Sequence, residues 1–174
     1  MIRIRPSTDQ DIPEITAIYV HFVLHSTATF ETEAPSVEEM AKRRQEVLTK
    51  GLPYLVVTVD DQVMGFAYAN WFKPRAAYRF SAENSIYLRI DAAGKGFGKL
   101  LLSELLMQLE RRGVRKVMAV IGGSENFASI GLHKALGFTP AGLIESAGWK
   151  QDRWLDLVLM QRTLGVGSSL PPAV

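Results

Sequence analysis

Apolar positions recur along the chain with two different spacings, and each spacing predicts a kind of element. Where they fall three or four residues apart, an amphipathic helix is expected. Four such segments are present, beginning near Thr8 and near Ser36 and covering residues 98–112 and 126–136. Ser36 and Glu39 have the spacing of a capping box, and Gly113 directly follows the leucine-rich third segment as a helix-ending residue. The chain therefore carries four predicted helices.

Other apolar segments alternate with polar residues, or run uninterrupted and are rich in β-forming residues, which predicts strands. They comprise a hairpin over residues 53–71 around Asp60-Asp61, strands at 83–90 and 115–121, and an antiparallel pair containing AGLIES and RWLDLVLMQRTL. Neither a repeat nor a linker separates these elements. The pattern therefore predicts one α/β domain with a mixed sheet over residues 1–164, followed by a flexible C-terminal tail at 165–174.

Composition narrows the class of protein. The chain has 174 residues, of which 47% are hydrophobic, enough for one domain with a substantial core. It contains no long apolar run and no cysteine, and its N-terminus lacks the apolar stretch of a signal peptide. A net charge of +2 is too mild for a nucleic-acid-binding surface. We therefore expect a cytoplasmic protein that binds neither a membrane nor nucleic acid.

The segment RIDAAGKGFGKLLLSELL, residues 89–106, places three glycines between a predicted strand and a predicted helix. The first amides of a helix have no acceptor within the helix, and the helix dipole adds positive potential there. Gly94, Gly96 and Gly98 would let an anion approach those amides closely, and Lys95 and Lys99 add charge. The segment thus predicts a phosphate site. The alternative is a tight turn whose glycines serve packing alone.

Two common nucleotide-binding patterns do not fit this glycine turn. The mononucleotide loop requires Ser or Thr after Gly-Lys, but Leu100 follows Lys99. The dinucleotide pattern requires a third small residue, and Lys99 or Leu101 stands there instead, depending on the register. A nucleotide-binding regulator is therefore disfavoured.

Two segments resemble the GNAT superfamily of N-acetyltransferases. AAGKGFGKLLLSELL is similar to its acyl-CoA pyrophosphate loop, [QR]-x-x-G-x-[GA], and SENFASIGLHKALGF is similar to its N-x-x-[AS] helix. TATFETEAPS, GLPYLVV, AENSIYLR and GWKQDRWLDLVLMQ narrow the resemblance to the phosphinothricin and methionine sulfoximine N-acetyltransferase group, over nearly all of residues 3–164. The resemblance implies the GNAT fold: α/β (α+β), a mixed, mostly antiparallel twisted sheet flanked by helices. Ala93 departs from the pattern, since it stands where the pattern has Arg or Gln.

The resemblance implies a set of residues that bind acetyl-CoA. Main-chain groups of the strand before the glycine turn would hold the pantetheine arm, with the Leu88 N–H pointing at the thioester oxygen, and the turn would hold the pyrophosphate. The implied residues are Ile86, Tyr87, Leu88, Gly94, Lys95, Gly96, Phe97, Gly98, Lys99, Asn126 and Ser129. An ordinary central strand, and an N-cap role for Asn126, are the alternatives.

Two residues are implied to be catalytic. Glu83 stands where the group carries a general base, which would take the amine's proton directly or through a water. His133 stands where many superfamily members have the acid that protonates the leaving thiolate. A solvated strand-end glutamate and a hydrogen-bonded structural histidine are the respective alternatives.

The acceptor amine would bind beside Glu83. Lys73, Arg75 and Tyr78 lie in the loop that leads to Glu83, and Phe30 would form an apolar wall. Cations there suit an acceptor that carries a carboxylate. FKPRAAY has one residue more than expected for the herbicide-resistance members, so its register is open, and a basic solvated loop is the alternative.

The implied activity is transfer of an acetyl group from acetyl-CoA to the α-amine of a small amino-acid analogue of the phosphinothricin or methionine sulfoximine type. Direct transfer in a ternary complex is expected because the chain has no cysteine to carry the acetyl group. No metal is expected, and the resemblance suggests a homodimer. The alternatives are a GNAT enzyme for another amine, such as a polyamine or a protein N-terminus, and a non-catalytic acyl-CoA sensor.

Overall fold

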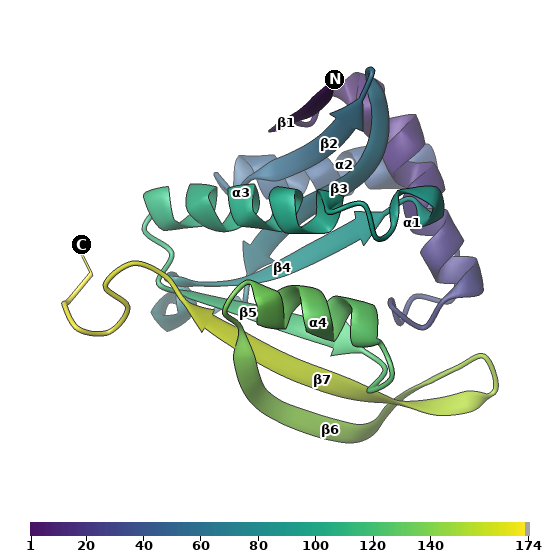
Figure 1. The fold of residues 1–174 in the computed structure, drawn as a ribbon. Coiled ribbons are helices and arrows are strands. Elements are labelled where there is room, and N and C mark those ends of the chain that lie inside the picture. Colours follow the sequence, from purple (N-terminus) through teal and green to yellow (C-terminus); the bar gives the residue numbers. More distant parts are fainter. Residues whose placement is uncertain (173–174) are drawn as a thin grey trace.

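A computed structural model describes residues 1–172, which form one seven-stranded sheet in the order β1-β2-β3-β4-β5-β7-β6 (Figure 1). The strands are β1 (Ile2–Pro6), β2 (Tyr54–Val59), β3 (Gln62–Trp71), β4 (Ser81–Leu88), β5 (Lys116–Gly122), β6 (Thr139–Lys150) and β7 (Arg153–Thr163). Every neighbouring pair is antiparallel except β4 and β5, which are parallel. The predicted fold class, a mixed and mostly antiparallel sheet flanked by helices, is confirmed.

Four α-helices cover the two faces of the sheet. They are α1 (Ile12–His25), α2 (Val37–Thr49), α3 (Phe97–Arg111) and α4 (Phe127–Ala135), and short 3-10 turns occupy η1 (Asp9–Asp11), η2 (Ala76–Tyr78) and η3 (Ile90–Ala92). In Figure 1, α3 and α4 lie in front of the sheet, and α1 and α2 lie behind it. The Ser36 hydroxyl accepts the Glu39 N–H at 3.1 Å, as the capping pattern predicts. All four predicted helices are present, with small differences at their ends.

The strand β1 was not predicted. It is an edge strand of five residues that pairs antiparallel with β2, with Ile2 opposite Val59. Ile2 and Ile4 alternate with Arg3 and Arg5, which is a strand pattern, but the segment is too short for the alternation to stand out. The pairing with β2, more than fifty residues away, stabilises a strand that the local sequence pattern alone does not predict.

Two hairpins turn on residues in the left-handed region. Asp60 and Asp61, between β2 and β3, have φ of 48° and 67°. Gln151 and Asp152, between β6 and β7, have φ of 52° and 56°. Two consecutive residues of positive φ form the turn whose twist matches antiparallel strands. The predicted hairpin around Asp60-Asp61 is confirmed, and the second joins the two strands predicted to close the sheet.

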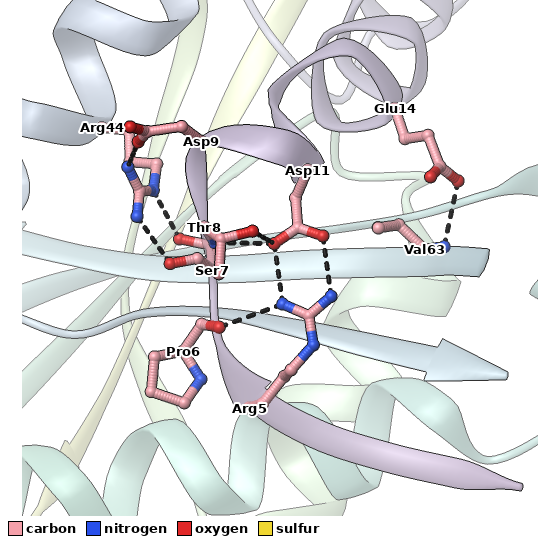
Figure 2. A network of polar contacts seen from close by, with 9 residues as sticks. All are labelled: Arg5, Pro6, Ser7, Thr8, Asp9, Asp11, Glu14, Arg44 and Val63. Atoms are coloured by element: carbon pink, nitrogen blue, oxygen red, sulfur yellow. Dashed lines mark hydrogen bonds and ion pairs between the residues drawn. The ribbon is translucent and has the colours of Figure 1, made fainter. Parts of the chain in front are cut away.

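Two ion pairs, each with one buried partner, hold the N-terminal segment, and one of them joins it to α2 (Figure 2). The side chain of Arg44 is buried, and it donates to Ser7 Oγ at 2.7 Å, to the Ser7 carbonyl at 2.5 Å and to Asp9 at 2.6 Å. Arg5 donates two hydrogen bonds to Asp11, at 2.7 and 2.8 Å. Asp11 also accepts the main-chain N–H of Thr8 at 2.6 Å, which closes the predicted turn before α1. Complete pairing of this kind makes the burial of charged groups tolerable.

The chain continues past β7 in a series of turns. Gly167 donates its N–H to the Leu164 carbonyl at 3.0 Å, and its own carbonyl accepts from Arg115 at 3.0 Å. Leu164 itself is buried. The division into a domain at 1–164 and a flexible tail at 165–174 stays a prediction, and residues 173–174 lie outside the described part of the chain.

Candidate active site

The sheet opens between β4 and β5. The two strands pair from Ser81 opposite Lys116 to Asn84 opposite Ala119 and no further, although β4 continues to Leu88 and β5 to Gly122. On the other side of β4, the Arg89 N–H donates to the Met64 carbonyl of β3 at 2.8 Å. Main-chain groups alternate in direction along an antiparallel ladder, so those of Ile86 and Leu88 turn away from β3 and toward the opening. An ordinary central strand would be paired on both sides, and this one is not.

A cavity of about 590 Å³ lies over this opening. It is lined by β4, the glycine turn, the end of β5, the start of α4 and the exit of α1, including Phe22, Ala28, Asn84, Ala93, Ile121 and His133. The predicted coenzyme residues that line it are Ile86, Tyr87, Leu88, Gly94, Gly96, Gly98, Lys99, Asn126 and Ser129. The remaining two do not: Lys95 is exposed and Phe97 packs into the core. One cavity thus joins segments spread over most of the chain.

The glycine turn ends in a helix that begins inside the cavity wall. Gly94 and Gly96 have φ of +74° and +83°, a conformation that favours glycine, and Gly96 is the N-cap of α3. The first hydrogen bond of the helix runs from Leu100 N–H to the Gly96 carbonyl at 3.2 Å, so the preceding amides have no acceptor within the helix. Those amides and the helix dipole suit an anion.

The third glycine has a packing role. A Cβ added to Gly98 would lie 3.3 Å from both Leu132 of α4 and Leu88 of β4. By contrast, a Cβ on Gly94 or Gly96 would meet nothing within 4 Å. The alternative interpretation, glycine for packing, therefore applies to Gly98, whereas the other two are required by backbone conformation.

Glu83 and Asn84 point to opposite faces of the sheet because they are neighbours on a strand. Asn84 contacts α4, and Tyr87, on the same face as Glu83, contacts Tyr19 and Phe22 of α1. Glu83 is half-buried and does not line the cavity. Burial raises the pKa of the Glu83 carboxyl, and the positive charge of Lys73 opposes that shift. A carboxyl with a raised pKa is suited to proton transfer near neutral pH.

His133 is buried between α4 and β4. Its Nδ1 lies 2.8 Å from the Ser129 carbonyl and its Nε2 lies 2.9 Å from the side-chain nitrogen of Asn84, while Phe138 packs edge-on against the ring at 4.9 Å. Burial lowers its pKa, and the hydrogen bond to Ser129 opposes that effect. The geometry agrees with the alternative interpretation, a hydrogen-bonded structural histidine. The acid role stays a prediction, and it would require one of these contacts to break.

The predicted acceptor residues do not line the cavity of this chain. Lys73, Arg75 and Tyr78 are exposed in the loop between β3 and β4, where the Lys73 ammonium lies 5.3 Å over the Phe72 ring and Tyr78 packs edge-on against it at 5.8 Å. Of the three, Lys73 is the one whose positive charge lowers the pKa of Glu83. All three side chains are open to solvent.

Phe30 is held between two strands that sequence reasoning did not connect to it. A Cβ on Gly148 of β6 would lie 2.6 Å from the Phe30 ring, and one on Gly122 of β5 would lie 2.9 Å from it. Gly122 also lies against the Thr27 carbonyl, which a Cβ would approach to 2.5 Å. These glycines make room for the segment at the exit of α1, next to Ala28 in the cavity wall.

Two further residues of the site were missed. Asn84 follows Glu83 on an alternating strand, which places it on the opposite face, but its partner lies 49 residues away. Lys150 is buried, and its ammonium donates to the carbonyls of Thr29 at 2.8 Å and Phe22 at 3.5 Å. Burial lowers the pKa of this ammonium. Neither residue carries a sequence signal beyond its residue type.

Neither a membrane-spanning helix nor a metal-binding cluster is present in the described part of the chain. Over residues 1–172, no helix is both long and apolar enough to span a membrane. No group of three or more histidine or acidic side chains within the same range is placed to hold a metal ion.

The open strand pair and the glycine-capped helix beside it define a protein that binds an extended ligand with an anionic group. The Acetyltransferase (GNAT) domain family matches residues 4–159, and the chain belongs to this family.

The chain also resembles individual acetyltransferases. It is 47% identical over 169 residues to the phosphinothricin N-acetyltransferase of Alcaligenes faecalis, covering 97% of this chain and 86% of the relative. It is 38% identical over 173 residues to the L-methionine sulfoximine/L-methionine sulfone acetyltransferase of Pseudomonas aeruginosa, covering 97% and 98%. A crystal structure of a GNAT superfamily phosphinothricin acetyltransferase from Sinorhizobium meliloti in complex with AcCoA superposes with a TM-score of 0.96 at 45% identity, covering 99% of this chain and 93% of that one.

Proposed function

We propose that this protein transfers an acetyl group from acetyl-CoA to the α-amine of a small amino-acid analogue of the phosphinothricin or methionine sulfoximine type, by direct transfer in a ternary complex. The observation that carries the proposal is the opening between β4 and β5, whose cavity runs from the glycine turn to the exit of α1. The names of the relatives at 47% and 38% identity support the choice of acceptor.

The described residues fit acetyl-CoA. The amides at the start of α3, with Lys99 beside them and Lys95 at the rim, suit the diphosphate. The main-chain groups of Ile86 and Leu88, which turn toward the opening, suit the pantetheine amides, and the Leu88 N–H suits the thioester oxygen. Asn126 and Ser129 line the far side. Acetyl-CoA supplies the activated acyl group. The chain supplies the frame that orients it.

Ala93 lines the cavity at the place where the family pattern has Arg or Gln. A methyl group cannot hydrogen-bond to a phosphate, so we propose that main-chain amides carry most of the diphosphate binding. The expected consequence is weaker coenzyme binding than an Arg at this position would give, not its loss.

Glu83 is the proposed general base. It lies on the face of the sheet that α1 covers, so it would meet the amine from the side opposite to the coenzyme turn. Because burial raises its pKa, the carboxylate is a better proton acceptor than an exposed glutamate. It would take the proton of the substrate ammonium directly or through a water. The rate should then fall as the pH drops through the raised pKa of Glu83.

The acceptor site is proposed from Phe30, Lys73, Arg75 and Tyr78. The positive charge of Lys73 acts on the pKa of Glu83, and Phe30 packs beside the cavity wall. Since Arg75 and Tyr78 are exposed, we propose that they complete the site of a second copy of the chain. Arg offers two parallel donors to a carboxylate, which an amino-acid acceptor presents.

We further propose a homodimer formed through the β6–β7 edge. The edge strand β6 and its hairpin expose Leu143, Ile144, Trp149 and Trp154 by 52%, 48%, 56% and 63%. Exposed apolar side chains gathered at one edge mark an interaction surface. Light scattering should give a dimer for the native chain, and Trp154→Lys should shift the mass toward a monomer. A native chain that is monomeric at assay concentration would contradict both the proposed dimer and the proposed shared acceptor site.

The composition supports a cytoplasmic enzyme without a nucleic-acid partner, since the net charge is only +2. A role in resistance to amino-acid analogues would follow from their acetylation. Growth of cells that express the protein, in the presence of methionine sulfoximine or phosphinothricin, tests that role.

The function is tested by thiol release from acetyl-CoA with a panel of amines: methionine sulfoximine, phosphinothricin, methionine sulfone and spermidine. We expect turnover with the amino-acid analogues. Turnover with spermidine alone would favour an enzyme for another amine. Binding of acetyl-CoA without turnover of any amine would favour a non-catalytic sensor.

Glu83→Gln tests the mechanism. It should lower kcat about a hundredfold, the lower end of the effect of a general base, and should leave acetyl-CoA affinity unchanged. The matched control is Glu110→Gln on the exposed end of α3, which should leave both quantities unchanged. An equal loss in both variants, or a kcat unaffected by Glu83→Gln, would remove Glu83 as the base.

A further inference from the structure

The pairing of Asn84 with His133 fixes the protonation state of the histidine. The Ser129 carbonyl can only accept, so the 2.8 Å contact requires a proton on Nδ1 of His133. The 2.9 Å contact between Nε2 and the Asn84 side-chain nitrogen then requires Nε2 to accept, because that nitrogen is a donor. Rotating the Asn84 amide by half a turn would bring its oxygen toward the lone pair of Nε2. In the orientation that the Asn84 amide has in the structure, the neutral Nδ1–H tautomer is the form that satisfies both contacts.

Among residues 1–172, the polar and aromatic groups that contact the His133 ring carry no charge. The ring contacts Asn84 from β4, Ser129 from its own helix and Phe138 before β6, all of which are uncharged. Arg162 of β7 reaches this end of α4 through the Leu136 carbonyl, at 2.5 Å, and not through the ring. Burial lowers the pKa of His133 in agreement with this surrounding.

Asn84 lowers the stability of the fold at this position. It is 5% exposed, and its side-chain oxygen has no hydrogen-bond partner among residues 1–172. A buried acceptor without a partner costs stability, which an apolar side chain of similar shape would avoid. The amide is thus oriented by one contact only, its donation to His133. Asn84 is also the last residue of β4 that pairs with β5, at the point where these two strands separate.

We infer that Asn84 is a positioning residue whose amide holds His133 neutral and occupies the lone pair of its Nε2. The histidine ring then shapes the closed end of the cleft and does not exchange a proton with the coenzyme sulfur. To act as an acid, the ring would first have to gain a proton at Nε2, the atom that Asn84 covers. The proton balance closes without His133. As the C–N bond forms, the amine nitrogen sheds one proton, and the sulfur that takes the electron pair of the C–S bond gains one.

The inference rests on the proposed function only in its kinetic part, because the state of the ring is measurable in the protein without substrates. Long-range ¹H–¹⁵N spectra of the full-length chain between pH 5 and 8 should show His133 as the neutral Nδ1–H tautomer throughout.

Asn84→Asp tests the side chain directly. A carboxylate can accept from Nε2–H, so the pKa of His133 should rise by about one to three units and the imidazolium should appear within the measured range. An unchanged His133 titration in a folded Asn84→Asp protein would overturn the inference. So would a native His133 that becomes protonated within the measured range, between pH 5 and 8.

His133→Gln is the kinetic test and does not depend on Asn84→Asp folding. A glutamine amide can donate to the Ser129 carbonyl and accept from Asn84, but it cannot act as an acid. If His133 positions, the variant should retain kcat within about tenfold of the native value, with any larger change in the KM for acetyl-CoA. If His133 is the acid, kcat should fall about a hundredfold or more with a changed alkaline limb of the pH profile. A loss beyond tenfold in kcat overturns the inference and leaves the proposed acetyl transfer standing. His21→Gln on α1 is the matched control.

Discussion

The two regions that bury polar side chains differ in how completely those side chains are partnered. Around Arg44, a buried guanidinium meets Ser7 and Asp9 through three hydrogen bonds (Figure 2). At the opening between β4 and β5, the buried Asn84 has one partner, and its oxygen has none among residues 1–172. The first region joins β1 and α2. The second lies where two strands part and a ligand would enter.

The difference indicates which region of the fold pairs its polar groups for stability and which region leaves some of them unpaired. From β1 to β4 the strands pair along their lengths with one irregularity, between Val57 and Thr58, and the buried polar side chains of β1 to β3 and α2 have hydrogen-bond partners. Beyond Asn84 the main chain of β4 is unpaired on one side. Unsatisfied groups cost stability, so they persist in a native structure where a ligand or a reaction uses them. Three substitutions test this contrast.

The largest expected effect falls on the glycine turn. Gly96→Asp should lower acetyl-CoA affinity by about a hundredfold or more, because it places a carboxylate beside amides that would bind the diphosphate. Isothermal calorimetry measures this affinity. Gly113→Asp is the matched control, since Gly113 has nearly the same φ, +82° against +83°, and a Cβ at either position meets nothing within 4 Å. Micromolar binding by the Gly96→Asp protein would contradict the assignment of the turn.

An intermediate effect, on stability alone, is expected for Arg44→Met. It removes the partner of Ser7 Oγ and of the Ser7 carbonyl in a buried setting, so the free energy of unfolding should fall by about 2 kcal/mol. Denaturant titration measures it, and the KM for acetyl-CoA should not change. Arg111→Met, which removes an exposed cation of α3, should alter neither. A large change in KM would mean that the two regions are coupled.

The smallest effect concerns pH. Burial raises the pKa of Asp11, but hydrogen bonds from Arg5 and Thr8 outweigh it and hold the pKa below its usual value. A carboxyl with a lowered folded-state pKa contributes stability above its unfolded pKa, about 4, and loses it as the pH falls through the lowered value. Asp11→Asn should therefore flatten the loss of unfolding free energy below pH 4, by about 1 kcal/mol. Thermal melts between pH 2 and 7 provide the curve. If stability falls with pH in the same way in both proteins, Asp11 is not the source of this pH dependence.

Local patterns predicted most of the fold because most elements carry their own signals. The capping residues, the Asp60-Asp61 turn and the leucine-rich third helix all appear where the sequence places them. The strand β1 was missed because a short edge segment depends on its partner. The glycine turn could be predicted because strand, glycines and helix are contiguous, and an anion site needs nothing more.

The chemistry of the site was harder to predict because it depends on contacts between distant segments. The pairing of Asn84 with His133 spans 49 residues, and the burial of Lys150 under the exit of α1 spans 121 residues to Thr29. Periodicity assigns each of these residues to a face, but not to a partner. Glu83 lies on the face of the sheet that α1 covers, whereas His133 contacts Asn84 on the other face, and only the assembled sheet makes this visible.

The Phe30 ring lies between Gly122 and Gly148. The backbones of two strands that are distant in sequence therefore set the position of this ring. One methyl group at residue 148 would lie 2.6 Å from that ring, so the ring would have to move. Under the proposed acceptor role of Phe30, alanine at residue 148 should change the size of acceptor that the enzyme prefers, and a directed search for new acceptors should include it.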